Sequence, residues 1–95
     1  MHNLTETLAE RGSRYRKYAE HARITQQIQY TLQTGKSWQR ATDSQKEALE
    51  MIAHILGRIV NGDPHYHDSW HDIAEYATLV SEQLKANERP ATSTF

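Results

Sequence analysis

Apolar side chains recur along the chain at intervals of three and four residues, the spacing of one face of an α-helix. No segment alternates apolar and polar residues with the two-residue period of a strand. The pattern predicts an all-α protein whose three main helices complete a helical bundle by oligomerisation. A short helical turn is expected over residues 4–10, and the main helices over residues 13–33, 44–60 and 68–86.

Capping signals set the expected helix ends. Ser13 is a suitable N-cap for the first main helix, and Gly35 is a suitable stop after it. The second helix opens on a capping-box pattern from Ser44 to Glu47. After it, the Asn-Gly-Asp-Pro segment at residues 61–64 interrupts the helical pattern.

The second main helix is apolar over an unusually wide arc. Its apolar side chains cover about 200° of a helical wheel, more than two neighbouring helices would cover. Apolar residues make up only 37% of the 95 residues, and the chain has no cysteine to form disulfides. We therefore expect a homo-oligomer, a dimer or a higher assembly. In the third helix, Trp70 and Ile73 are expected on the buried side.

One domain is expected over residues 1–87, followed by a flexible tail over residues 88–95. No apolar run approaches the roughly 20 residues that a membrane-spanning helix needs. The N-terminal residues also lack the basic and apolar regions of a signal peptide. These features predict a cytoplasmic protein with no membrane partner.

Charge is divided unevenly between the two parts of the chain. Residues 1–40 carry seven basic and three acidic side chains, whereas residues 41–95 carry four basic and nine acidic ones. Such a division suits a chain that pairs its own halves, or a second copy, electrostatically. The chain lacks the net basic character of duplex-DNA binders, so a duplex nucleic acid is not expected as a partner.

Carboxylates gather on the polar arcs of the second and third helices. Helical spacing places Glu47 with Glu50, and Asp68 with Asp72. If these faces meet, their oxygens would bind a hard cation such as Mg²⁺ or Mn²⁺. The alternative is structural, with Glu47 as a capping-box acid, Asp68 as an N-cap and Asp72 near the positive end of the helix dipole.

Histidines form a second cluster, made of His65, His67 and His71, with His54 on the preceding helix. His67 and His71 have the i, i+4 spacing of helical zinc ligands, so a zinc site is one hypothesis. The other hypothesis is a polar loop in which His71 hydrogen-bonds a carboxylate.

A basic stretch near the start of the first main helix contains Arg14, Tyr15 and Lys17. Arginine binds phosphate through two parallel hydrogen bonds, and a tyrosine ring stacks on a base, so these three residues are candidates for binding a nucleotide. The alternative is a solvated helix face whose tyrosines belong to the core.

Family resemblance is strongest at residues 61–64 (NGDP) and 68–74 (DSWHDIA). Over about residues 5–85, the chain resembles an uncharacterised family of small proteins from tailed bacteriophages and prophages. That family distantly resembles the MazG-type all-α nucleotide pyrophosphohydrolases. In those enzymes, Glu-x-x-Glu on one helix and Glu-x-x-Asp on the next bind Mg²⁺ around a nucleoside triphosphate.

The resemblance implies a Mg²⁺-dependent nucleotide pyrophosphohydrolase-like protein in the infected host cell. It aligns Glu47 and Glu50 with the first acidic pair and Asp72 with the final acid. Ser69 takes the place of the remaining acid, and Asp68, one residue earlier, is the expected substitute. Asp68 and Asp72 would then be catalytic. The alternative is a non-catalytic phage accessory protein that sequesters a nucleotide signal or inhibits a host defence protein.

Overall fold

The computed structural model describes residues 4–92, with side chains for residues 8–88, and within this range it is all-α, as predicted. Its three α-helices and single 3-10 turn follow one another without an intervening strand. In chain order they are α1 (Leu4–Gln33), η1 (Trp38–Arg40), α2 (Asp43–Asn61) and α3 (His67–Thr92).

Two of the predicted helix boundaries are wrong. The N-terminal turn and the first main helix form one continuous helix, α1, which runs through Gly12 and Ser13. A single glycine within a helix costs only about 1 kcal/mol, and the arginines and glutamates on either side favour helix. At the other end, α3 continues past residue 86 to Thr92. The flexible tail over residues 88–95 stays a prediction, and residues 93–95 lie outside the described part.

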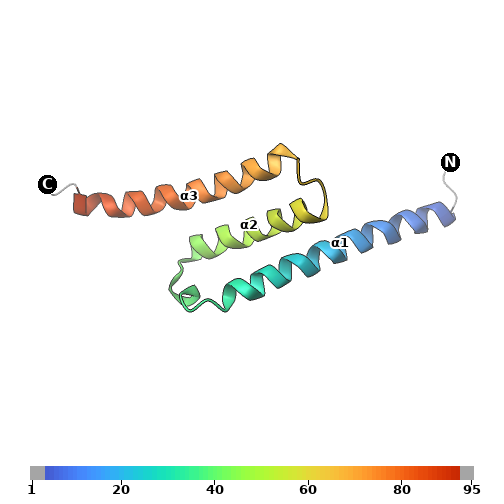
Figure 1. Cartoon of the computed structure of the whole chain (residues 1–95), viewed down its shortest axis with the longest axis horizontal. Helices are drawn as coiled ribbons and strands as arrows, with labels where there is room; N and C mark the ends of the chain where they lie inside the picture. The colour runs from blue at the N-terminus through green and yellow to red at the C-terminus, as the bar shows by residue number, and fades with distance from the viewer. Residues whose placement is uncertain (1–3, 93–95) are drawn as a thin grey trace.

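The helices form a single layer and not a closed bundle. α2 lies in the middle and packs against α1 on one side and α3 on the other (Figure 1). The molecule measures 72 × 28 × 19 Å, because the start of α1 and the end of α3 project in opposite directions. Its radius of gyration is 19.0 Å, against about 12 Å for a compact domain of this length.

Small residues bring α1 and α2 close together. Thr25 is fully buried and Ala53 is 1% exposed at this joint. A Cβ atom on Gly57 would lie 2.6 Å from Thr25 Oγ1 and 3.2 Å from the His21 ring. At the end of α2, the Asn61 side-chain amide donates a hydrogen bond of 3.2 Å to the carbonyl oxygen of Lys17. The helices could not approach this closely with a larger residue at position 57.

Aliphatic side chains and one buried hydroxyl join α2 to α3. Ile55 and Ile59 are each 5% exposed, and Ser69 on α3 is 1% exposed. Arg58 Nε donates a hydrogen bond of 3.2 Å to Ser69 Oγ, so the buried hydroxyl has a partner. This bond helps to fix how α3 is placed along α2.

The prediction that Trp70 is buried is wrong for the single chain. Trp70 is 53% exposed, and its indole Nε1 donates a hydrogen bond of 2.9 Å to the carbonyl oxygen of Pro64. The ring therefore holds the loop between α2 and α3 without entering a core. Other large apolar side chains are also exposed, among them Leu56, Val60, Leu79 and Leu84.

A capping box opens α2, but it begins two residues earlier than predicted. Thr42 is the N-cap, and its hydroxyl accepts a hydrogen bond of 3.1 Å from the Gln45 backbone amide. In return, the Thr42 amide donates a bond of 2.8 Å to Gln45 Oε1. Both Thr42-Asp-Ser-Gln and Ser44-Gln-Lys-Glu fit the sequence pattern, and only the first has the extended backbone that an N-cap requires.

This assignment predicts different effects for two neighbouring hydroxyls. Thr42→Ala should lower the free energy of unfolding by about 1 kcal/mol, because the first turn of α2 loses its cap. Ser44→Ala should change it by less than about 0.5 kcal/mol, as for an ordinary surface position. Urea denaturation of both variants measures the difference. A larger loss for Ser44→Ala would place the cap at Ser44 after all.

Candidate functional site

The register of α2 against α3 separates the predicted carboxylates. The two helices run antiparallel, and Arg58 contacts Ser69 and Asp72. Glu50 lies eight residues before Arg58, which is about 12 Å along the helix axis. Glu47 lies one turn further away. Within one chain, Glu50 and Asp72 therefore do not face each other.

Asp72 instead pairs with a cation. Arg58 Nη2 donates a hydrogen bond of 3.3 Å to Asp72 Oδ2, and both side chains are about half exposed. The same guanidinium bonds Ser69, so one arginine holds two side chains on the first turns of α3. The resemblance expects an acid at position 69, but Ser69 is part of the interface between α2 and α3.

Asp68 has two neighbours of its own at the start of α3. Its carboxylate lies 3.4 Å from His67 Nδ1, and it accepts a hydrogen bond of 3.1 Å from the Tyr66 hydroxyl. Both contacts stabilise the charged carboxylate and hold the pKa of Asp68 below its ordinary value. The bond with Asp68 also raises the pKa of Tyr66. A lowered pKa makes Asp68 a weaker general base at neutral pH.

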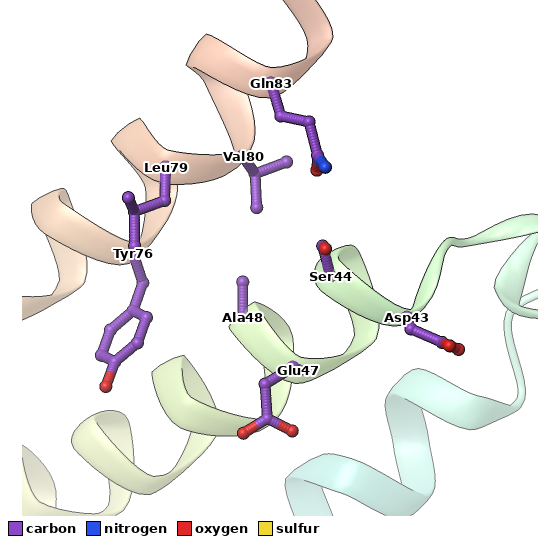
Figure 2. A pocket seen from close by; sticks show the side chains of 8 residues that line it. All are labelled: Asp43, Ser44, Glu47, Ala48, Tyr76, Leu79, Val80 and Gln83. Atoms are coloured by element: carbon purple, nitrogen blue, oxygen red, sulfur yellow. The ribbon is translucent and has the colours of Figure 1, made fainter.

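Glu47 lies beside an open hollow between the start of α2 and the middle of α3. The hollow has a volume of about 510 Å³, and Ala48 and Val80 point towards each other across it (Figure 2). The Glu47 carboxylate is directed away from the α3 side chains. Asp43, one turn earlier on α2, is the other acid that lines the hollow.

The four predicted metal ligands are not gathered at one place in the described part of the chain. Among the residues with described side chains, no group of three or more histidines, aspartates and glutamates is placed to hold a metal ion. Mg²⁺ or Mn²⁺ binding by Glu47, Glu50, Asp68 and Asp72 therefore stays a prediction.

Four of the histidines form two stacked pairs. His67 and His71 stack with ring centroids 5.9 Å apart, and His71 Nε2 lies 2.7 Å from Glu75 Oε1. The predicted contact between His71 and a carboxylate is confirmed. His54 stacks instead on His21, at the joint of α1 and α2. His21 could not be found from local sequence, because 33 positions separate it from its partner.

A basic, tyrosine-bearing face lies on the projecting part of α1. Because Asn61 at the end of α2 bonds Lys17, the preceding residues of α1 extend past α2. Arg11, Arg14, Tyr15 and Tyr18 have i, i+3, i+4 and i+7 spacing and share one side of this segment. We call these four residues the arm face.

The tyrosines of the arm face do not belong to a core. Tyr15 is 72% exposed and Tyr18 is 69% exposed. Within residues 8–88, neither Arg14 nor Lys17 pairs with a carboxylate. The candidate nucleotide-binding residues Arg14, Tyr15 and Lys17 are thus grouped on α1 and accessible.

Comparison with known proteins gives no further assignment. No family model, curated protein or solved structure matches the chain. The resemblance to phage proteins and to MazG-type enzymes therefore stays a prediction. Among the described residues, no helix is long and apolar enough to cross a membrane.

Proposed function

We propose that the chain is a non-catalytic accessory protein that binds the phosphates of a nucleotide through the arm face. The observation that carries the proposal is the exposure of Tyr15 and Tyr18 beside Arg11 and Arg14 on one side of a projecting helix. Polar side chains are enough to keep a helix in solution, so exposed aromatic rings are not needed for that purpose. Two exposed rings on one side of a helix therefore indicate a binding surface. The phage setting comes from the resemblance.

The chemistry of the arm face suits a nucleotide. Arg11 and Arg14 lie one helical turn apart, so their guanidinium groups can reach neighbouring phosphates, each through two hydrogen bonds. The rings of Tyr15 and Tyr18, also one turn apart, offer flat surfaces for a base. Lys17, one turn after Arg14, adds a further positive charge next to this face.

The positions of the carboxylates favour binding over catalysis. Asp72 pairs with Arg58, and Ser69 replaces an acid in the enzyme pattern while it is buried in the joint of α2 and α3. Glu50 lies about 12 Å along the helix from this pair. The carboxylates that a pyrophosphohydrolase would use as metal ligands are therefore not gathered at one place among the described residues.

Fluorescence anisotropy with a labelled ATP analogue tests the proposal. Arg14→Gln should weaken binding at least about tenfold, because hydrogen bonds to charged groups contribute roughly 1.5–3 kcal/mol. Arg16→Gln is the matched control, since Arg16 lies on the opposite side of α1 and should leave affinity unchanged. Tyr15→Ala and Tyr30→Ala, with rings exposed to a similar extent, form a second matched pair.

Two results would contradict this function. Equal affinity of Arg14→Gln and the unmodified chain would show that the nucleotide binds away from the arm face. Release of pyrophosphate from nucleoside triphosphates with Mg²⁺ or Mn²⁺ would show that the protein is an enzyme.

A further inference from the structure

One side of the α2–α3 layer is apolar, and the opposite side is polar. The Arg58–Asp72 ion pair marks the polar side. Leu56 lies two residues from Arg58, and Trp70 two residues from Asp72, which places each about 160° around its helix from the ion pair. Both side chains therefore lie on the side of the layer away from the pair, where Leu56 is 37% and Trp70 is 53% exposed.

Helical spacing extends this apolar side along both helices. Leu49, Ile52 and Leu56 follow one another on α2 at intervals of three and four residues. On α3, Trp70, Ala77 and Leu84 recur every seven residues. We call these six residues the apolar face. Two adjacent antiparallel helices that each carry an apolar seam of this period form half of a four-helix bundle.

The exposed area of the chain is larger than that of a compact domain of the same mass. The chain exposes 7771 Å², whereas a compact protein of 11.0 kDa would expose about 5,600 Å². The excess of roughly 2,200 Å² per chain falls within what a permanent homodimer buries, about 1,000–2,500 Å² from each partner. The excess area is therefore of the size that each partner buries in a permanent dimer.

We infer that the apolar face binds the same face of a second copy, and that two α2–α3 pairs together form a four-helix core. In a two-fold symmetric dimer, the same surface of each copy binds its counterpart, so a second copy is enough to cover the apolar face. This inference does not depend on nucleotide binding.

Two leucines on opposite sides of the layer supply the test. Leu56→Lys puts a charge on the apolar face of both copies and should raise the dimer dissociation constant at least about a hundredfold. Leu79 lies seven residues after Asp72, on the polar side of α3, and is 64% exposed. Leu79→Lys should therefore leave the dimer intact.

Light scattering across a concentration series gives the masses of the unmodified chain and both variants. A dimeric unmodified chain, a Leu56→Lys chain that dissociates and a Leu79→Lys chain that does not would support the inference. A mass of 11.0 kDa for the unmodified chain at micromolar concentration would overturn it. Dissociation by Leu79→Lys alone would also overturn it, because the partner would then bind the polar side.

Circular dichroism and the milder variant Leu56→Ala distinguish dissociation of the dimer from a loss of folding in Leu56→Lys. If the inference is correct, Leu56→Ala raises the dissociation constant about tenfold or more while helix content at high concentration is retained. An unchanged constant for Leu56→Ala in a folded dimer would place the interface elsewhere and contradict the inference.

Discussion

Gly57→Ala is expected to lower the free energy of unfolding by about 1–3 kcal/mol, the range for overpacking a close joint. The new methyl group would lie 2.6 Å from Thr25 Oγ1, and Thr25 is fully buried, so its side chain has little room to move. In a helix interior, the same substitution ordinarily stabilises by up to about 1 kcal/mol. The sign of the change in the free energy of unfolding therefore shows whether α1 and α2 are in close contact at this position.

A second glycine and a double variant make this prediction specific. Gly12 on α1 faces open space apart from Arg16 Nη1 at 3.4 Å, so Gly12→Ala should be neutral or stabilising by up to about 1 kcal/mol. Thr25→Ala removes the clashing oxygen and should recover most of the loss in the Gly57→Ala background. Chemical denaturation of the four proteins measures these effects. Stabilisation by Gly57→Ala alone would contradict the close contact of α1 and α2.

The sequence predicts the helices well and their ends less well. Apolar spacing identified α2 because its buried side chains, such as Ile55 and Ile59, recur at helical intervals. The N-cap of α2 was missed because two overlapping segments carry the same capping pattern, at Thr42 and at Ser44. Only backbone geometry distinguishes them. Gly57 went unrecognised as well, although a glycine inside a strongly apolar helix is a signal of close packing.

The sequence could not show whether the candidate metal ligands come together. A helical wheel gives the direction of each side chain around its own helix, but not its position along the axis relative to a neighbouring helix. It places Glu47 with Glu50, and Asp68 with Asp72, on the polar side of each helix. It does not show how far α3 is shifted along α2. That shift depends on the intervening loop and on the buried contact between Arg58 and Ser69. As a result, Asp72 pairs with Arg58 and not with Glu50.

The arm face contains residues that the sequence did identify. The sequence identified Arg14, Tyr15 and Lys17 as candidates, but it left the burial of the tyrosines undecided. Helix α2 ends at Asn61, level with Lys17, and so leaves this part of α1 uncovered. Exposure depends on where a neighbouring helix ends, and no local pattern in α1 contains that information.

The thermal unfolding midpoint is expected to depend on protein concentration, because two chains share one core. For a folded dimer that unfolds to two separate chains, the midpoint rises with concentration by mass action. With roughly 0.7 kcal/mol of unfolding enthalpy per residue over two copies, the rise is about 4 °C for each tenfold increase.

Differential scanning calorimetry over a hundredfold range of concentration tests the central claim that the chain completes its core with a second copy. The expected result is a total rise of about 8 °C in the midpoint, with a single cooperative transition at each concentration. Leu79→Lys should show the same slope, since Leu79 lies away from the apolar face. A midpoint that stays constant over the whole range would show that the three-helix layer is stable as a single chain, and would contradict the claim.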